Sequence, residues 1–332
     1  MSKLNRQLGI SLVEVLVALV ISLFLLAGIV QVYTGNKQTF AFTNALAEIQ
    51  ENARFAMEIM SQDLRLAGEW GCIAFNSADT TNINDTLNAG NVAGYNTDYH
   101  DFVGEESIEG ENGTGLNGSD TLTIRGGKPS QTNVEGPFTT STTQNIFTDT
   151  TNTITAGDII LVARCGANDL LIAAEADILP VTSVVVGTTS DQRRINLGAN
   201  KSQQFENDAM VIELQTVDYD IQNGAGGGPA LFRSEFGVAQ ELVEGVQDMQ
   251  VLYGIDNDSD QFPNQYVTAD LVTDWEEVVA VRISLLMQSI EDFVTEDPQT
   301  ITFNGVTSTP GDRRIRQVFT TTVALRNRIG SM

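Results

Sequence analysis

Residues 10–32 read ISLVEVLVALVISLFLLAGIVQV, and Glu14 is the only charged residue among them. A helix of this length spans roughly 34 Å, which is enough to cross the ~30 Å hydrocarbon layer of a membrane. The preceding residues 1–9 are polar and carry Lys3 and Arg6, whereas few basic residues follow the segment closely. The positive-inside bias therefore predicts one membrane span, with the rest of the chain outside the cytoplasm.

The segment after this stretch, residues 34–67, keeps helical spacing but has only one apolar stripe. The stripe steps by three or four residues and comprises Leu46, Ile49, Ala53, Ala56, Met60, Leu64 and Ala67. No proline occurs before Pro129, so the spacing predicts one continuous helix that ends at about Arg65. Gly68 and Gly71 fit the helix stop, because glycine takes a positive φ at little cost. We expect the stripe to pack on a sheet.

The remainder of the chain, residues 68–332, has the pattern of a β-rich head. Between residues 75 and 157 the sequence is polar and rich in turn residues, with one expected strand at 121–125. Further β-patterned runs lie at 159–163, 181–186, 194–197, 209–218, 230–233, 249–255, 279–287 and 319–325. The strongest runs alternate apolar and polar residues, which predicts an antiparallel sheet covered by the helix. The expected fold class is therefore α+β.

The composition excludes several classes of function. The 332 residues carry 43 acidic and 18 basic side chains, a formal net charge of −25, so the body is not expected to bind nucleic acid. The lone histidine, His100, is expected in a surface loop. The pattern groups no nucleophile with a base and an orienting residue, and it offers no zinc or CxxC centre. We expect a protein that is not an enzyme and requires no cofactor.

Glu14 needs an explanation, because a carboxylate within an apolar span costs at least ~2.5 kcal/mol. One interpretation is that cleavage between Gly9 and Ile10 creates a cationic α-amine, which pairs with Glu14 of a neighbouring subunit. The alternative is a carboxylate near the membrane interface that reaches back to the lipid headgroups.

The polar leader, Gly9 and the following ISLVE, with glutamate at the fifth position after the glycine, resemble the class III signal of type IV prepilins and type II secretion pseudopilins. The resemblance implies that prepilin peptidase cleaves after Gly9 and methylates the amine of Ile10. It also implies that Glu14 aligns the subunit in the growing filament. The chain would then consist of a leader (1–9), a transmembrane or filament-core helix (10–33), the amphipathic half of the helix (34–67) and the head (68–332).

Residues 49–72, IQENARFAMEIMSQDLRLAGEWGC, narrow the family. They resemble the PilW group of minor pilins, in which such a helix leads into a signature that here comprises Arg65, Ala67, Gly68, Gly71 and Cys72. Segments 118–127, 242–260 and 279–289 agree with this resemblance. It implies a pilin-like fold and a minor pilin that helps to prime assembly of the type IV pilus. Such a subunit would sit at or near the pilus tip and support motility and adhesion.

The same resemblance implies partners and a location. The expected partners are other minor pilins, the major pilin, prepilin peptidase, the inner-membrane assembly platform and a tip adhesin. Before assembly one span would hold the chain in the inner membrane with its head in the periplasm, and afterwards the subunit would lie in the pilus at the cell surface. Two alternatives stay open: a type II secretion pseudopilin resembling pseudopilin J, and a binding module whose acidic loops at 75–157 recognise a surface or a sugar.

Two further groups of residues are candidate sites. Cys72 and Cys165 are the only cysteines and are expected in an oxidising compartment, where a disulfide is the economical interpretation and two buried thiols the alternative. Asp256, Asp258 and Asp260 have a D-x-D-x-D spacing that can direct several oxygens at one calcium ion. The EF-hand pattern does not continue beyond them, so an ordinary acidic turn is the alternative to a calcium site.

Overall fold

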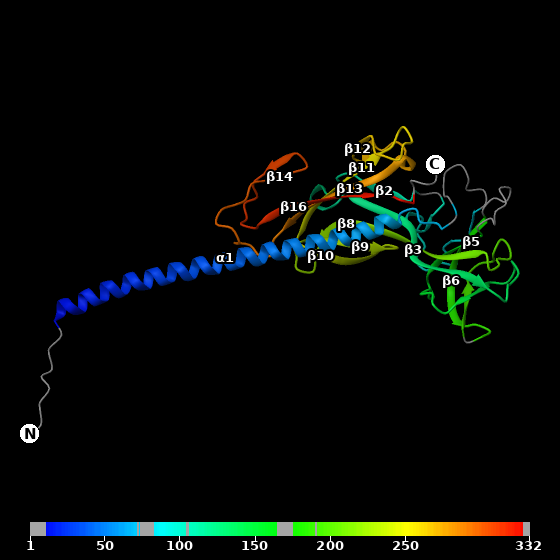
Figure 1. Ribbon diagram of the computed structural model, residues 1–332, viewed down its shortest axis with the longest axis horizontal. Helices are drawn as coiled ribbons and strands as arrows, with labels where there is room; N and C mark the ends of the chain where they lie inside the picture. Colours follow the sequence, from blue (N-terminus) through cyan, green and yellow to red (C-terminus); the bar gives the residue numbers. More distant parts are fainter. Residues whose placement is uncertain are drawn as a thin grey trace, which may run out of the picture. The chain divides into compact units, whose positions relative to one another are not determined.

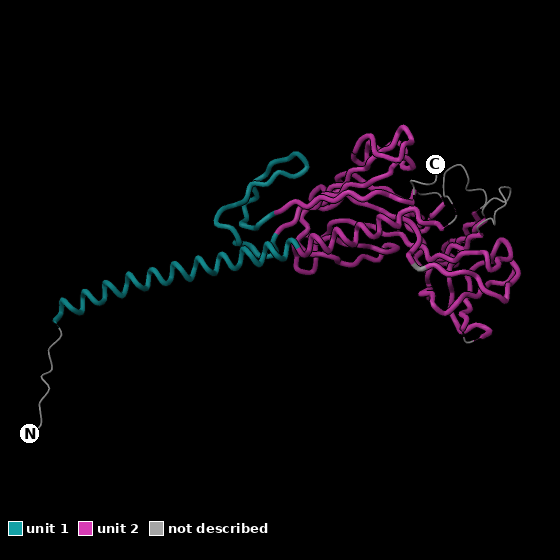
Figure 2. Tube along the Cα trace, viewed as in Figure 1, with its two compact units in different colours: residues 1–50, 289–316 teal, residues 51–288, 317–332 magenta. Residues whose placement is uncertain are grey.

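The computed structural model describes residues 11–71, 73, 83–103, 106–164, 175–189 and 191–327. The chain divides into two compact units, residues 1–50 with 289–316 and residues 51–288 with 317–332 (Figure 2). The helices are α1 (Leu12–Leu66), α2 (Thr97–His100), η2 (Leu116–Gly118), η3 (Ala269–Leu271) and η4 (Trp275–Glu277). The strands, many of them labelled in Figure 1, are β1 (Ile83–Asp85), β2 (Ile108–Glu111), β3 (Thr121–Glu135), β4 (Asn145–Asp149), β5 (Ile159–Arg164), β6 (Glu175–Val186), β7 (Gln192–Leu197), β8 (Ala209–Asn223), β9 (Pro229–Glu235), β10 (Val238–Glu244), β11 (Val246–Ile255), β12 (Gln265–Val267), β13 (Val278–Gln288), β14 (Ile301–Phe303), β15 (Val306–Ser308) and β16 (Arg316–Ala324).

Helix α1 is continuous over 55 residues, as the sequence predicts. At its start the Ser11 hydroxyl accepts a hydrogen bond from the backbone N–H of Glu14 at 3.1 Å, which caps the first turn. At its end Gly68 and Gly71 both have a φ of +69°, so the predicted glycine stop is confirmed. The helix extends one residue beyond Arg65, where its end was expected.

The second half of α1 buries its apolar stripe. The stripe residues with 0% exposure are Ala53, Ala56, Met60, Leu64 and Ala67. Three of these five are alanines, whose small side chains permit a close approach between the helix and the strands beneath it. On the same stretch of helix Phe55 points outward and is 50% exposed. The prediction of a one-sided amphipathic helix is confirmed for this half.

The end of α1 docks on β3 through the backbone. The N–H of Gly68 donates to the carbonyl of Arg125 at 3.0 Å, and the N–H of Gly127 donates to the carbonyl of Glu69 at 2.8 Å. At Gly126 a Cβ atom would lie 2.2 Å from the carbonyl oxygen of Leu66, so only glycine fits there. The two adjacent glycines of β3 therefore let the chain beyond the helix join the sheet.

Strands β3 and β8 form the centre of the large sheet. Each has 15 residues, and they pair antiparallel along both halves of their length. The second half of β8 also pairs with β9, β9 pairs with β10, and β2 pairs with the first half of β3. These five strands, in the order β2-β3-β8-β9-β10, include the strands that α1 contacts.

The remaining halves of β3 and β8 belong to a closed barrel of six strands. The order is β8-β5-β6-β7-β4-β3 and back to β8, and each neighbouring pair is antiparallel. Closure leaves these strands without a free edge. The barrel has its own apolar core, which comprises Val134, Ile146, Ile154, Ile160, Val162, Leu179, Val181, Ile195, Leu197, Phe205, Ala209 and Val211.

The outer face of β5 and β6 is buried as well. A second apolar cluster covers it, and in this cluster the rings of Trp70 and Phe102 meet edge to face with their centroids 6.1 Å apart. Leu161 and Ala163 of β5 belong to this outer cluster, whereas Ile160 and Val162 belong to the barrel core. Burial on both faces explains why β5 is an unbroken apolar run instead of an alternating one.

A second sheet has four strands in the order β12-β11-β13-β16, and β11 and β13 are antiparallel. Asp120, at the start of β3, ties β11 to the large sheet. Its N–H donates to the carbonyl of Met249 at 2.8 Å, and its carboxylate accepts from the N–H groups of Val251 at 2.7 Å and Gly113 at 2.8 Å. Asp120 is 3% exposed, and this burial raises its pKa. A buried carboxylate satisfied by backbone donors thus joins the two sheets.

The smaller unit pairs the first part of α1 with residues 289–316, which contain the hairpin β14-β15. The carbonyl of Arg313 accepts from the N–H groups of Val294 and Thr295 at 3.0 Å each, and the Arg313 guanidinium lies over the Phe293 ring at 4.4 Å. Together with Lys37 of α1, several of these residues line a shallow cleft of about 410 Å³. The sequence did not predict this hairpin.

The α+β fold with a long helix on an antiparallel-rich head is confirmed, but the expectation for residues 75–157 was incomplete. The single strand expected at 121–125 is β3, which continues to Glu135, and β2 and β4 lie in the same region. Strand β10 was also missed. The strand was expected to end at Arg125, whereas in the structure it continues through Gly126 and Gly127, which accommodate the chain that leaves α1.

Candidate functional site

The first half of α1 presents apolar side chains that the chain itself leaves uncovered. Among the described residues one helix is long and apolar enough to cross a membrane, and its most apolar 18-residue window has a mean hydropathy of 2.8 with 0% of the window buried. Exposure reaches 77% at Leu12, 76% at Phe24 and 64% at Val32. A core helix of a soluble protein would be buried, whereas the described residues leave this surface uncovered.

Glu14 lies in the first turn of this apolar segment and is exposed. No ion pair involves its carboxylate among the described residues, which begin at Ser11. Gly9 and Ile10, the residues of the expected cleavage site, lie outside the described residues. The segment thus combines an uncovered apolar surface with one carboxylate that lacks a described partner.

Asp63 fixes the second half of α1 to the head. Its carboxylate accepts from the Tyr219 hydroxyl of β8 at 2.5 Å and from Nε of Arg233 in β9 at 2.8 Å. Asp63 is 8% exposed, and Tyr219 is fully buried. Burial raises the pKa of Tyr219, and the neighbouring Asp63 carboxylate raises it further. The phenol therefore stays a neutral donor to Asp63 at physiological pH.

The ion pair of Asp63 continues into a chain of charges across the sheet. Arg233 lies 3.3 Å from Glu235, and Lys128 lies 2.8 Å from Glu235 and 2.5 Å from Glu213. Burial lowers the pKa of Lys128, but hydrogen bonds from its ammonium to the two glutamates outweigh that effect and raise it. Because each charge has a counter-ion, the network positions the helix without leaving a buried charge unpaired.

Sequence reasoning missed this network. The signal available was Asp63 itself, a charged residue between the apolar stripe positions Met60 and Leu64. Such a residue indicates a polar partner on the packed surface, but the sequence does not say which strand supplies it. Tyr219 and Arg233 are more than 150 residues away along the chain.

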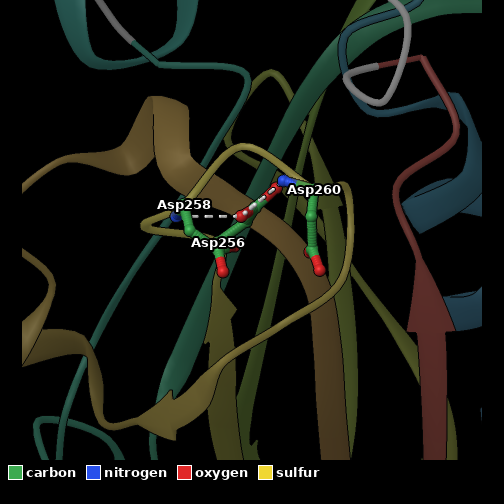
Figure 3. Close-up of side chains that lie close together, drawn as sticks. All are labelled: Asp256, Asp258 and Asp260. Carbon is green, nitrogen blue, oxygen red and sulfur yellow. Dashed lines mark hydrogen bonds between the residues drawn. The ribbon is translucent and has the colours of Figure 1, made fainter.

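The acidic turn after β11 brings Asp256, Asp258 and Asp260 together, as Figure 3 shows. One carboxylate oxygen from each lies within 4.8 Å of the others. Calcium binds oxygens at about 2.3–2.6 Å, so this separation fits ligands on opposite sides of one ion. Asp258 and Asp260 are exposed, whereas Asp256 is 2% exposed.

Asp256 also has a role within the turn. Its Oδ1 accepts from the N–H groups of Asp258 and Asp260 at 3.3 Å each, and its Oδ2 accepts from the N–H of Gln261 at 2.7 Å. Burial raises the pKa of Asp256, but the backbone donors outweigh it and hold the value below its usual range. The turn is therefore held by Asp256 without a cation, and calcium binding stays a prediction.

Two other expectations have different outcomes. Cys72 and Cys165 both lie outside the described residues, so the disulfide stays a prediction. The expectation for His100 was wrong, because it is 4% exposed and its ring stacks on Phe236 at a centroid distance of 5.2 Å. Helix α2 turns the imidazole inward, which the flanking polar sequence did not indicate.

Two protein families match the sequence at opposite ends. Residues 4–30 match the prokaryotic N-terminal methylation motif, and residues 218–327 match the type IV pilus-assembly protein W family. No curated protein matches the chain. Among solved structures, the chain is similar to the type IV-like pilin TTHA1219 from Thermus thermophilus, with 14% identity, coverage of 53% of this chain and 85% of that chain, and a TM-score of 0.21. At that score the likeness carries no argument, so the assignment depends on the two family matches.

Each of the two matched regions corresponds to a distinct part of the structure. The first contains the uncovered apolar segment with Glu14, and the second runs from Asp218 in β8 through β9, β10, the four-stranded sheet and the last strand, β16. The two matches support a minor pilin of the PilW type in the type IV pilin family.

Proposed function

We propose that this minor pilin helps to prime assembly of the type IV pilus and sits at or near the pilus tip, as a structural subunit and not an enzyme. The observation that carries the proposal is the apolar surface of residues 12–33, which is exposed throughout and contains Glu14. Motility and adhesion are then properties of the assembled pilus. The match to a pilus-assembly family favours the pilus over a type II secretion structure.

In this proposal prepilin peptidase cleaves after Gly9, and the new α-amine of Ile10 pairs with Glu14 of a neighbouring subunit. The apolar half of α1 then moves from lipid into a bundle of like helices, which exchanges one apolar environment for another. An ammonium–carboxylate pair in such a bundle fixes the register of two helices, because an unpaired charge there is costly.

The partners follow from that mechanism. They are the other minor pilins and the major pilin in the bundle, prepilin peptidase and the inner-membrane platform before assembly, and a tip adhesin above the subunit. Before assembly one span holds the protein in the inner membrane with its head in the periplasm.

The test is deletion of the gene, followed by complementation with wild type or with Glu14→Ala. We expect few surface pili in the deletion and in the Glu14→Ala strain, and normal pili with wild type. Glu58→Ala is the matched control, because Glu58 is an exposed carboxylate on the same helix, where it accepts from Gln62 Nε2 at 3.0 Å. Normal piliation in the deletion strain would refute the priming role.

We also propose that the acidic turn binds calcium and that Cys72 and Cys165 form a disulfide. Thermal unfolding with calcium or with chelator should differ by a few degrees for wild type and not for the Asp258→Asn, Asp260→Asn variant. Alkylation before and after reduction, read by mass spectrometry, should label the two thiols only after reduction. Equal melting with and without calcium, or labelling before reduction, would contradict the respective proposal.

A second candidate function, recognition of a surface or sugar, is favoured by one observation. The barrel has its own core, and most of it lies outside the region that matches the pilus-assembly family. The loop between β3 and β4, residues 136–144, is the segment to replace with a glycine-serine linker. Loss of attachment with normal pili would support a binding role, whereas unchanged attachment would exclude this loop.

A further inference from the structure

Lys37 lies on α1 just beyond the apolar segment that the proposed function places in the membrane. That segment ends at Tyr33, whose side chain is 68% exposed. A tyrosine at the end of a span is typical of the membrane–water interface. Lys37 is about one helical turn farther along α1, roughly 6 Å at ~1.5 Å per residue. The headgroup layer on each side of the hydrocarbon is about 5–8 Å thick, so the span puts Lys37 at the depth of the lipid headgroups.

Residues 289–316 bring a second cation to the same place. This segment and the first part of α1 belong to one compact unit (Figure 2). They enclose a cleft of about 410 Å³, and the residues that line it are Thr34, Lys37, Gln38 and Ala41 of α1 with Phe293, Thr295, Glu296 and Arg313 of the segment. Lys37 and Arg313, which are far apart in the sequence, therefore line one cleft next to the end of the span.

Arg313 is held in position by the fold of its segment. Its backbone N–H donates to Oδ1 of Asp292 at 2.8 Å, and its carbonyl accepts from two backbone N–H groups at 3.0 Å each. Its guanidinium lies over the Phe293 ring, 4.4 Å from the centroid, and Nη1 donates to the carbonyl of Glu296 at 3.4 Å. The cation is therefore a built part of the cleft.

Both cations lack a counter-ion within the described part of the chain. No ion pair of Lys37 or Arg313 is found among the described residues, whereas Lys128, Arg233 and Arg316 are each paired with a carboxylate. The whole chain carries 43 acidic and only 18 basic side chains. Two cations that share a cleft in so acidic a protein without an ion pair indicate an anionic ligand from outside the chain.

The other lining residues limit the kind of anion. Glu296, the one carboxylate in the lining, is exposed, so the cleft suits a group with one negative charge better than a polyanion. Phe293 is 67% exposed in spite of its contact with Arg313. Exposed aromatic rings beside basic residues are typical of protein surfaces that lie in the headgroup layer of a membrane.

The position of the cleft selects the ligand among singly charged anions. At the depth that the span gives to Lys37, the most abundant anions are the phosphates of the phospholipids themselves. An acidic segment of another protein would have to enter the headgroup layer to reach the same cations. A neighbouring cleft of about 420 Å³ shares Gln38, Thr295 and Glu296 but has no basic residue in its lining, so the positive charge is specific to the first cleft.

We propose that the cleft of Lys37 and Arg313 binds the phosphate of a phospholipid headgroup, with the Phe293 ring among the headgroups. The proposal rests on the membrane-held state in the proposed function and concerns the subunit before assembly. Aromatic and basic residues beside a span set its depth and tilt in the bilayer. The cleft therefore fixes how deep α1 lies, and with it the depth of Glu14, until the subunit leaves the lipid for the filament.

The test uses the full chain in nanodiscs of phosphatidylcholine and phosphatidylglycerol, with and without a lipid that carries a spin label on its headgroup. Phe293→Trp supplies a fluorescent probe and keeps an aromatic ring beneath the Arg313 guanidinium. The wild-type chain, with Trp70 and Trp275 in the other compact unit, gives the background emission. We expect the label to quench the added emission by about twofold or more, because an interfacial ring sits at the level of the headgroups.

Removal of the cations should take the probe away from the lipid. In the Phe293→Trp background, Lys37→Gln with Arg313→Gln should reduce the quenching by about twofold or more, because each basic residue contributes to attraction by an anionic surface. Lys37→Gln alone, at an exposed position where misfolding is not expected, should reduce it in part. Arg54→Gln with Arg194→Gln is the matched control. It removes two exposed cations outside the cleft, one of them about 26 Å farther along α1, and should leave the quenching unchanged.

The outcomes separate this proposal from the proposed function. The headgroup contact is overturned if the chain inserts into nanodiscs but the probe is not quenched, if quenching persists without Lys37 and Arg313, or if the control variant reduces it equally. Each of these results leaves the priming role intact, because piliation tests that role separately. A chain that does not insert into nanodiscs would overturn the membrane span of the proposed function and the headgroup contact with it.

Discussion

Glu14 and Asp63 are two carboxylates on the same helix with opposite surroundings. Asp63 is 8% exposed and is held by Tyr219 and Arg233. Glu14 is exposed among apolar side chains, and no ion pair involves it among the described residues. The described residues satisfy the charge of Asp63, and none of them forms an ion pair with Glu14.

The apolar residues of the two helix halves show the same contrast. Met60 is 0% exposed, whereas Phe24 is 76% exposed. Hydrophobicity is high in both places, so it does not by itself decide what the folded chain buries. The second half is stabilised by folding of the head, whereas the described residues of the head leave the first half exposed.

Removal of Asp63 should give the largest effect on the stability of the isolated subunit. Asp63→Ala leaves Arg233 and the Tyr219 hydroxyl without their shared acceptor, and we expect a loss of about 3 kcal/mol in the free energy of unfolding. Denaturant titration of the full chain in detergent, followed by the fluorescence of Trp70 and Trp275, measures it. Glu14→Ala is the matched variant and should leave this free energy unchanged while it reduces piliation. Equal free energies of unfolding for Asp63→Ala and Glu14→Ala would contradict the proposed difference between the two helix halves.

The next largest effect is expected from adding one methyl group to a glycine. Gly126→Ala places a Cβ atom 2.2 Å from the carbonyl oxygen of Leu66, so the end of α1 must move from β3 at a cost of about 2–3 kcal/mol. At Gly28, in the apolar half, a Cβ atom meets nothing within 4 Å. Gly28→Ala should therefore unfold in the same denaturant range as wild type. A large loss of stability at Gly28 would show that this half also packs within the subunit.

Lys201 is a buried charged residue for which no ion pair is found among the described residues, in contrast with Asp63, which pairs with Arg233. It is 4% exposed and donates to the Thr139 hydroxyl and to the carbonyls of Thr143 and Asn145 at 2.7 Å each. Burial lowers its pKa from 10.5 to about 8, with a smaller opposing effect of Asp177.

The lowered pKa of Lys201 makes the free energy of unfolding depend on pH. From pH about 8 to about 10.5 the unfolded chain holds a proton on Lys201 that the folded chain has lost, so this residue makes stability rise with pH in that range, and its contribution is constant below pH about 8. Lys201→Met should lower stability by about 1–2 kcal/mol and remove that contribution. The check is the difference between wild-type and variant unfolding free energies across this range, and a constant difference would contradict the assignment.

The smallest effect is expected at Phe55, which lies on the buried half of α1 but points outward at 50% exposure. Phe55→Ala should change the free energy of unfolding by at most about 0.5–1 kcal/mol, in contrast with Met60→Ala at about 2–3 kcal/mol. Thermal unfolding of both variants gives the comparison. A similar loss at both positions would mean that α1 is covered on two sides.

The elements with strong local patterns were predictable. Apolar residues at steps of three or four from Ala53 to Ala67 predicted the helix, and the glycines at 68 and 71 predicted its end. The alternation of apolar and polar residues predicted β11, β13 and β16. The barrel was not recognised, because β4 has only five residues and neither β4 nor the second half of β3 has an apolar periodicity. Their pairing depends on β7 and β8, which follow much later in the chain.

Some candidate sites could be recognised from local sequence, whereas others depend on contacts between distant segments. Glu14 could be recognised from its position relative to Gly9. The three aspartates of the acidic turn could be recognised from their spacing to one another. The network around Asp63 joins the helix to strands that are distant in sequence, with Tyr219 and Arg233 as its partners. No sequence spacing encodes those contacts, because strand register sets them.

The amino-acid sequence alone determined the uncovered apolar helix, its lone glutamate and the one-sided stripe that follows. These features depend on local periodicity and on the cost of a charge in an apolar environment, both of which can be evaluated residue by residue. Only the tertiary structure decided that Asp63 is satisfied and that β3 and β8 serve both a barrel and an open sheet. Those properties come from non-local pairing, where the environment of a side chain is created by residues that are distant along the chain, as Tyr219 and Arg233 are from Asp63.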